Sequence, residues 1–454
     1  MTMDFVCPNG ARALPGPWRR VWHPFRKGPV LLFLAALALL AAGCSHSSSD
    51  TAPTITAQPQ SASVITGRAV SFSVTAAGTG ALAYQWAKDG QAILGAQAAT
   101  LTLYNPGLQD AGQYVVTVSN TLGTATSTPA ILTVAAGLTF TSPFGVVSDA
   151  TGNLYVSDAE DHAIWKVDST GRKTLLAGTP GVPGSADGVG SAAQFRFPGG
   201  LAFDPSGNLL VADTGNDTLR RIAPDGTVTT LAGAAGVPGT TDAVGAAARF
   251  NAPIGLAVDA SGVAYLGDSG NHTIRRVATD GTVSTYAGLA GQPGFLNGSA
   301  ASAQFNEPNG VALAADGTLY VADYGNSCIR AISPTGSVST LAGQPGTHGS
   351  ADGTGAAASF YWPVGLTVDA SGSVWVADTY NHALRKILAG GIVSTVAGSG
   401  GTLGNLDGTG TAARFDLPCG VAVTPSGDLV VADTGNRFLR RVTTAGVVTT
   451  FTAP

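Results

Sequence analysis

The apolar positions from residue 138 onward come in short runs separated by turn residues, and these runs repeat along the chain. Residues 211–222 read VADTGNDTLRRI, which is an apolar run, a turn and a second run. Copies of this stretch begin at Tyr155, Tyr265, Tyr320, Trp375 and Val430. The aspartates of the copies recur at one constant step along the chain, at Asp158, Asp213, Asp268, Asp323, Asp378 and Asp433. A residue that stands in every copy serves the fold, because one reaction does not need so many equal centres.

The third unit shows how each repeat divides into strands and turns. Runs at 255–259, 263–268, 272–277 and 282–288 predict four short strands, and a long glycine-rich connection follows them. Four strands per unit, in six units, predict an all-β fold with a six-bladed β-propeller over residues 138–454. The strands carry apolar runs because neighbouring blades cover both faces of each blade.

Two further features keep the same constant step without slippage. A Pro-x-Gly motif opens each unit, and a phenylalanine stands three residues before each proline. These phenylalanines are Phe140, Phe195, Phe250, Phe305, Phe360 and Phe415. We expect them to fill equivalent sites between the blades of one closed ring, and we expect closure to need both ends of the repeat region.

The repeat resembles the NHL family of propellers over residues 138–454, and its periodicity carries the resemblance. The resemblance implies a propeller fold. It also implies an alternative function, because NHL-like propellers include amidating lyases and, more distantly, lactonase-type enzymes with metal ligands around the channel mouth.

Residues 53–135 show short alternating strands, which predict an antiparallel sandwich. The segment resembles an immunoglobulin-like domain, with Trp86 in the position of the strand-C tryptophan and Tyr114 as the corner tyrosine. The family's disulfide would join positions 74 and 116, and both are valine here. Val74 and Val116 are therefore expected to pack against Trp86, and the domain to act as a spacer or adhesive module.

The amino terminus predicts a targeting segment. Basic residues precede an unbroken apolar run from Val30 to Ala42, which suits a signal peptide and is too short to span a bilayer. The following AAGCS resembles the lipobox of bacterial lipoproteins, and implies a signal peptide at 1–43, lipidation of Cys44 and a polar tether at 44–52. The alternative is a plain signal peptide that is cut nearby. Serine rather than aspartate at position 45 resembles lipoproteins that are sorted to the outer membrane. The expected location is therefore the cell envelope, facing the periplasm or the cell surface.

Charge argues against nucleic-acid binding. Loss of residues 1–43 would leave 18 basic and 27 acidic residues, a net charge near −9, with no basic cluster. The membrane is therefore expected as a partner only through the lipid. Cys328 and Cys419 lie in the fourth and sixth units, which do not adjoin in a ring, so no disulfide is expected between them.

The repeated polar residues are interpreted as structural. Each Asp ends a second strand before a Gly-Asn turn, where Asp and Asn side chains bond to nearby backbone. The arginines on the third strands, at 220, 275, 330, 385 and 440, either bridge to a neighbouring blade or lie on a solvated outer face. In the first unit Trp165 takes this place.

No metal or other cofactor is predicted. His162, His272 and His382 share one repeat position, but they begin third strands, too far from the axis to meet around one ion. Asp187, Asp352 and Asp407 are single carboxylates in glycine-rich loops, whereas calcium takes 6–8 oxygens, so we interpret them as turn residues.

Function is expected on the face that carries the turns between second and third strands and the long connections. The positions that the repeat leaves free there gather aromatic and polar residues in the fourth and fifth units: Glu307, Asn309, Tyr324, Tyr361, Trp362 and Tyr380. Exposed aromatic rings beside polar groups suit a protein, peptide or glycan ligand, although some of these rings could instead fill gaps between blades.

No nucleophile–base pair is evident, so no catalytic residue is predicted. The expected function is a lipid-anchored binding or scaffold protein of the cell envelope. A metal-dependent propeller hydrolase or lyase, lactonase-like or amidating-lyase-like, is the alternative.

Overall fold

The computed structural model describes residues 50–104 and 106–453, which divide into two compact units. The expected signal peptide and Cys44 lie outside these residues. The described chain consists of β-strands, 3-10 turns and loops, which confirms the all-β prediction. None of its helical turns is long and apolar enough to cross a membrane.

The immunoglobulin-like domain is built from short antiparallel strands around a tryptophan. They are β1 (Thr54–Ala57), β2 (Ala62–Ile65), β3 (Val70–Ser73), β4 (Thr75–Ala77), β5 (Ala83–Lys88), β6 (Gln91–Ala92), β7 (Thr100–Leu103), β8 (Gly112–Asn120), β9 (Gly123–Thr126) and β10 (Ala130–Ala135). Trp86 is fully buried and lies opposite Val116 in the β5–β8 pair. Val74 and Tyr114 are buried too, so an apolar core stands where the family has its disulfide.

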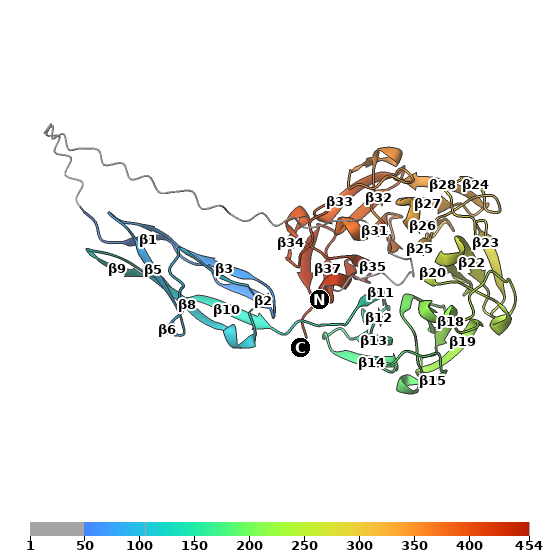
Figure 1. The fold of residues 1–454 in the computed structure, drawn as a ribbon, viewed down its shortest axis with the longest axis horizontal. Coiled ribbons are helices and arrows are strands. Elements are labelled where there is room, and N and C mark those ends of the chain that lie inside the picture. Colours follow the sequence, from blue (N-terminus) through green and yellow to red (C-terminus); the bar gives the residue numbers. More distant parts are fainter. Residues whose placement is uncertain (1–49, 105, 454) are drawn as a thin grey trace, which may run out of the picture. The chain divides into compact units, whose positions relative to one another are not determined.

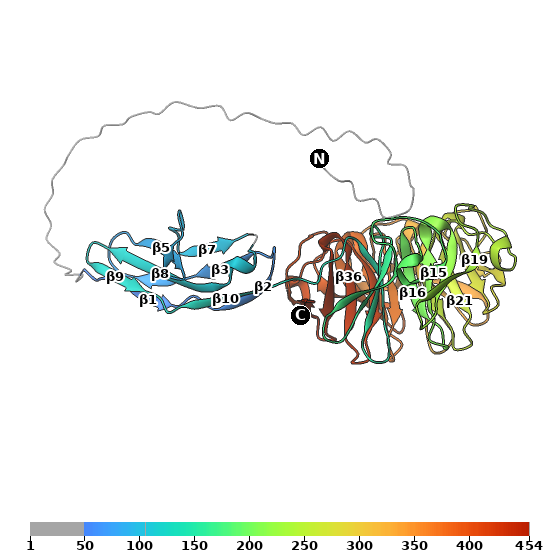
Figure 2. The same ribbon diagram turned by 90° about the horizontal axis from the view of Figure 1, so that it is seen from below.

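The propeller consists of six antiparallel sheets arranged around an axis (Figure 1). The innermost strands are β11 (Pro143–Ser148), β16 (Pro198–Phe203), β20 (Pro253–Val258), β25 (Pro308–Leu313), β30 (Leu366–Val368) and β35 (Pro418–Val423). The second strands are β12 (Leu154–Asp158), β17 (Leu209–Asp213), β21 (Ala264–Asp268), β26 (Leu319–Asp323), β31 (Val374–Asp378) and β36 (Leu429–Asp433). Figure 2 shows this ring from the side.

The outer half of each blade completes the pattern. The third strands are β13 (Ala163–Val167), β18 (Thr218–Ile222), β22 (Thr273–Val277), β27 (Cys328–Ile332), β32 (Ala383–Leu388) and β37 (Phe438–Val442). The fourth are β14 (Lys173–Gly178), β19 (Thr227–Gly233), β23 (Val283–Ala287), β28 (Ser337–Ala342), β33 (Ile392–Gly398) and β38 (Val447–Thr450). In the third blade these bounds agree with the four predicted runs to within two residues.

Four of the blades have a fifth, outermost strand of two residues, which was not expected. These strands are β15 (Gly188–Val189), β24 (Gly298–Ser299), β29 (Gly353–Thr354) and β34 (Gly408–Thr409). Each belongs to the long connection that enters its blade, so the glycine-rich segments are ordered against the blade edge.

The cores lie between blades, and the ring is closed. Phe195, Phe250, Phe305, Phe360 and Phe415 are fully buried, each in a cluster that joins two adjacent blades. Phe140 is 5% exposed and lies in the cluster that joins the last blade to the first. The prediction of equivalent interblade sites is confirmed.

The Pro-x-Gly glycines explain how closely the inner strands approach one another. A Cβ at Gly365 would collide with the carbonyl oxygen of Cys419, and one at Gly420 would collide with that of Phe144. The other four glycines meet the next blade in the same way, so the series of close contacts runs round the whole ring. Side chains are therefore excluded at this position in every blade.

Closure between the last and first blades, here called the seam, also uses hydrogen bonds. Thr434 Oγ1 donates to the Pro143 carbonyl at 2.6 Å, as Thr214 donates to Pro253 at 2.7 Å within the ring. The entering segment adds a second connection, because Leu138 N donates to Phe451 O at 3.2 Å and Ala453 N to Ala136 O at 3.0 Å.

The repeated Asp, Asn and Arg form a buried network, so the arginines do not lie on a solvated outer face. Arg220 is fully buried within its own blade and donates to Asp213 Oδ2 at 2.8 Å. It also donates to Asp187 Oδ1 at 2.7 Å, and its guanidinium carbon lies 5.1 Å from the centre of the Phe195 ring. Arg220 thus ties the entering connection to the blade, because its guanidinium bonds to a blade carboxylate and to a loop carboxylate at the same time.

The same network corrects the interpretation of the loop carboxylates. Asp352 and Asp407, like Asp187, form ion pairs with the arginine of their blade instead of serving only as turn residues. Burial raises the pKa of Asp213 and its equivalents in the third to sixth blades to about 6, although the arginines oppose this shift. At pH 7 these carboxylates are ionised and accept hydrogen bonds from the arginine, the turn asparagine and a backbone N–H.

Candidate functional site

Two classes of loop meet on one face of the propeller, here called the upper face. The second strands end there at their aspartates, and the long connections begin there. Gly181 N donates to Asp161 O, and Gly236 N to Asn216 O, so each connection starts against the turn of its own blade. The prediction that both loop classes share a face is confirmed.

Four of the predicted residues come together on this face. Trp362 stacks on Tyr324 with ring centres 5.5 Å apart and meets Tyr380 edge-on at 4.6 Å. Tyr361 lies 5.1 Å from Trp362 and 5.4 Å from Tyr380. Tyr324 is buried, while the other three rings are partly exposed, so the group is packed on one side and open on the other.

His348 joins this group and was not predicted. Its ring centre lies 4.6 Å from Tyr361 and 5.7 Å from Trp362, and its side chain is exposed. His348 belongs to the connection between the fourth and fifth blades, where the repeat has no regular histidine. Comparison of the repeats could have suggested it, because the equivalent positions in the other connections are Pro183, Pro238, Pro293 and Leu403. We call Tyr324, His348, Tyr361, Trp362 and Tyr380 the aromatic cluster.

The backbone fixes the aromatic cluster firmly. Trp362 has φ +50°, a left-handed conformation that is uncommon for a large side chain. Its N–H donates to Ser327 Oγ at 3.3 Å, and the same hydroxyl bonds to His348 Nδ1 at 2.8 Å. Tyr361 N donates to the buried Asp378 at 2.8 Å, so the blade network holds the residue beside Trp362.

The two predicted polar residues lie elsewhere. Glu307 is partly exposed at the junction of the third and fourth blades, where its N–H donates to His272 Nδ1 at 3.0 Å. Asn309 is 1% exposed, and its Oδ1 accepts a hydrogen bond from Ser269 Oγ at 3.0 Å. A ligand on the upper face would therefore meet the aromatic cluster without meeting Asn309.

The three histidines of the shared repeat position hold blades together. His162 Nδ1 accepts the Phe197 N–H at 3.2 Å, and His382 Nδ1 accepts the Leu417 N–H at 3.1 Å. Asp217 Oδ1 takes the same role in the second blade at 2.8 Å. Within residues 50–104 and 106–453, no three His, Cys, Asp or Glu side chains gather closely enough to hold a metal ion.

These histidines predict an acid-sensitive propeller. Burial lowers the pKa of His162, His272 and His382, and Nδ1 cannot accept the interblade hydrogen bond once it is protonated. Since the folded pKa lies below the unfolded value of 6.5, their contribution to stability is present above pH 6.5 and is lost as the pH falls through the folded values.

The test replaces all three histidines with serine, the residue that accepts this bond in the fourth blade. We expect the wild-type propeller to lose more stability than the variant between pH 7.5 and 5.5 in calorimetric scans. The buried carboxylates are identical in both proteins, so they cancel in the comparison. Parallel pH curves for the two proteins would contradict the interpretation.

The channel mouth on the upper face is mainly apolar. Phe144, Ile254, Val364 and Cys419 line it, above a cavity of about 60 Å³. Cys328 and Cys419 are both buried, and no disulfide joins them.

Comparison with known families agrees with this architecture. The family described as Immunoglobulin I-set domain matches residues 53–134, and the NHL repeat matches 195–222, 305–332 and 360–387. The chain therefore carries an I-set domain followed by NHL repeats.

Similar proteins differ widely in their full length. The chain is 32% identical over 314 residues to Protein SUPPRESSOR OF QUENCHING 1, chloroplastic, of Arabidopsis thaliana, covering 65% of this chain and 30% of that protein. It is 29% identical over 331 residues to human NHL repeat-containing protein 2, and the match covers 65% of this chain and 45% of that protein. The chain thus spans less than half the length of these relatives.

A solved structure shares the fold. It is described as an auxiliary nutrient binding protein from Bacteroides thetaiotaomicron, with a TM-score of 0.51 and 14% identity, and the match covers 85% of this chain and 96% of that one.

Proposed function

We propose that this chain is a lipid-anchored binding protein of the bacterial cell envelope, which recognises a protein, peptide or glycan through the aromatic cluster. The observation that carries this proposal is the gathering of Tyr324, His348, Tyr361, Trp362 and Tyr380 around one blade junction. Aromatic rings that are packed on one side and open on the other offer large contact area at little entropic cost.

The placement of the rings supports binding over a purely structural role. The repeat tolerates small side chains at these positions, because Ala252 stands where Trp362 does, with nearly the same φ of +48°. Gly215 and Gly270 stand where Tyr380 is in the fifth blade, and Thr214 and Ser269 stand where Tyr324 is in the fourth. Blade packing therefore does not require the aromatic rings that the fourth and fifth blades carry.

Two further observations support the proposal. The solved structure that shares the fold is described as an auxiliary nutrient binding protein, which suggests ligand capture as a role for this architecture. The basic flank, apolar run and Cys44 favour a lipid anchor, with the I-set domain as a spacer. An unmodified native amino terminus that does not begin at Cys44 in mass spectrometry would count against the anchor.

Trp362→Ala is the sharpest test of the binding role. Truncation of a central aromatic residue at a binding surface costs on the order of 2 kcal/mol or more, so we expect affinity for the bound partner to fall at least about tenfold. Partners would first be found with arrays of immobilised glycans and peptides, and affinities then measured by calorimetry. Ala252 shows that alanine fits this backbone, so the variant should fold.

The matched control is Asn251→Ala, which changes a free position at the junction of the second and third blades. It should leave affinity unchanged. The proposal fails if Trp362→Ala binds like wild type, or if Asn251→Ala is the variant that abolishes binding.

A further inference from the structure

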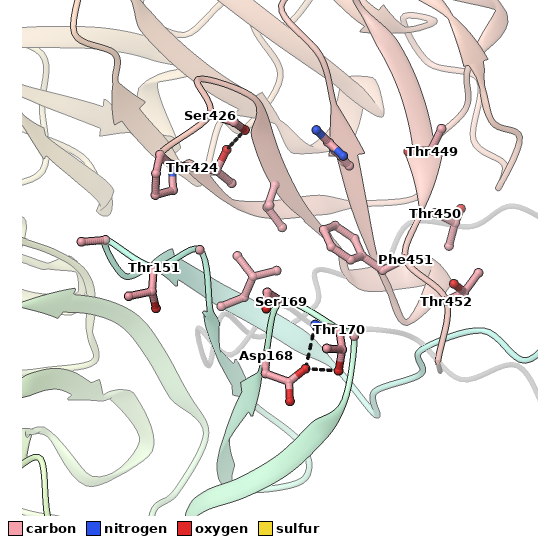
Figure 3. A pocket seen from close by; sticks show the side chains of 17 residues that line it. Thr151, Asp168, Ser169, Thr170, Thr424, Ser426, Thr449, Thr450, Phe451 and Thr452 are labelled. Atoms are coloured by element: carbon pink, nitrogen blue, oxygen red, sulfur yellow. Dashed lines mark hydrogen bonds between the residues drawn. The ribbon is translucent and has the colours of Figure 1, made fainter.

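The lower face of the propeller carries a pocket at the seam, remote in the fold from the loops that form the aromatic cluster. It encloses about 580 Å³ between turns of the first and sixth blades and the end of the last strand. This volume lies within the range of small-molecule sites. Figure 3 shows the ring of Phe451 directed into the pocket, with Thr424 and Ser426 on one side and Ser169 and Thr170 on the other.

The seam differs from the other junctions in one pair of side chains. At each other junction, the second residue of a blade's second strand packs in one cluster with the last residue of the next blade's inner strand. These pairs are Tyr155 with Phe203, Leu210 with Val258, Tyr265 with Leu313, Tyr320 with Val368, and Trp375 with Val423. At the seam the equivalent pair is Val430 with Ser148. Four of the five other pairs contain an aromatic ring, and the seam pair has none.

The lining is rich in hydroxyl groups. Thr151, Ser169, Thr170, Thr424, Ser426 and Thr452 contribute them. Hydroxyls both donate and accept hydrogen bonds, so this wall suits a ligand that does the same. Such a lining gives no preference for a strongly charged ligand.

The two charged groups of the pocket are already organised. Asp168 Oδ1 accepts hydrogen bonds from Thr170 N at 2.9 Å and Thr170 Oγ1 at 2.6 Å, which leaves Oδ2 for a ligand. Arg441 Nε donates to Asp428 Oδ2 at 2.7 Å, and Nη2 bonds to the same oxygen. This pairing neutralises the arginine and keeps Nη1 as a donor, so the pocket holds no free cation cluster of the kind that phosphate ligands need.

We propose that the seam pocket is a second binding site, which takes a short neutral saccharide. The apolar face of a sugar ring would lie on Phe451, while its hydroxyls bond to the threonine and serine side chains, to Asp168 Oδ2 and to Arg441 Nη1. Buried apolar contact from one aromatic ring with a few converging polar groups is the usual composition of such a site. The site is independent of the aromatic cluster.

The test uses Val430→Tyr, which fills the pocket with the residue that the chain itself carries at the equivalent positions 155, 265 and 320. The probes are neutral trisaccharides of glucose, xylose and mannose, titrated into the full-length protein by calorimetry and ligand-observed NMR. We expect at least one of them to bind, and Val430→Tyr to weaken it at least about tenfold. Phe451→Leu, which copies Leu176 and Leu341, should also weaken it by about tenfold.

The control is Asn251→Ala, which lies on the upper face outside both sites and should leave saccharide affinity unchanged. Val430→Tyr and Phe451→Leu leave the aromatic cluster intact, so loss of binding in these variants reports on the seam and not on the proposed function. The inference is overturned if none of the trisaccharides binds at millimolar concentration, or if a bound saccharide is insensitive to both Val430→Tyr and Phe451→Leu. It is equally overturned if a peptide from a library binds the protein and loses its affinity in Val430→Tyr, while no saccharide behaves in this way.

Discussion

Deletion of residues 446–454 should unfold the whole propeller rather than one blade. The segment contains β38, whose Val448 lies in the core between the fifth and sixth blades. It also contains Phe451, which packs in the core of the seam and whose carbonyl accepts the Leu138 N–H. The deletion therefore removes side chains from both junctions of the sixth blade. Because every blade buries its faces against two neighbours, an opened ring exposes an apolar blade face on each side of the break.

Hydrogen exchange of the full-length protein measures this result strand by strand. We expect β21 and β26, on the far side of the ring, to lose protection together with β36. The immunoglobulin-like strands β5 and β8 have their own core around Trp86 and should keep their protection from exchange, which provides an internal control. Retained protection of β21 and β26 beside an exposed sixth blade would show that the ring behaves as an open array.

The fold was predictable because the constant step of the repeat shows each element several times. A single Pro-x-Gly or Asp-Thr-Gly-Asn would be an ordinary turn, whereas repeated copies indicate the blade. The two-residue outer strands escaped prediction because glycine-rich segments have low strand propensity. Pairing such as Gly188 with Val228 comes from the blade edge beside the segment, which its own sequence does not reveal.

Side-chain partners were less predictable than strands. Arg220 lies 33 residues after Asp187, in a different element, so nothing local reveals that the pair forms. A charged residue on a strand suggests a solvent-exposed position. Only the folded blade shows that a buried carboxylate and a loop carboxylate both contact the arginine. The interblade role of His162 is likewise a contact across 35 residues.

The candidate site shows the same division. Comparison of the repeats identified Tyr324, Tyr361, Trp362 and Tyr380 as positions that the fold leaves free, and the structure brings their rings together. His348 differs from its counterparts in the other connections, which are Pro183, Pro238, Pro293 and Leu403, but only the folded chain shows that its ring meets Tyr361 and Trp362. The small pair Val430 and Ser148 was visible in the sequence, but it gains meaning only when the two residues are known to face one junction.

Arg275→Met should destabilise the propeller by about 3–5 kcal/mol at pH 7.5, because it leaves a buried carboxylate without its cation. Asp268 is fully buried, and Arg275 Nη1 donates to its Oδ2 at 2.7 Å. The second guanidinium nitrogen bonds to Asp242, so the variant also releases the entering connection. Calorimetric or urea unfolding of the propeller transition measures the loss.

The pH dependence separates the uncompensated charge from lost packing. Burial already raises the Asp268 pKa to about 6, and removal of the arginine, which lowers it, must raise it further. A folded pKa above the unfolded value of 3.8 means that the folded protein takes up a proton as the pH falls, so the deficit of Arg275→Met should shrink between pH 7.5 and 5. Adding Asp268→Asn to Arg275→Met should recover much of the loss at pH 7.5, since the amide is neutral and still accepts the Asn251 N–H that now bonds to Asp268 Oδ1 at 2.7 Å. If the double variant is as unstable as the single one at both pH values, the arginine acts through packing on Phe250, 5.3 Å from its guanidinium carbon, rather than through charge.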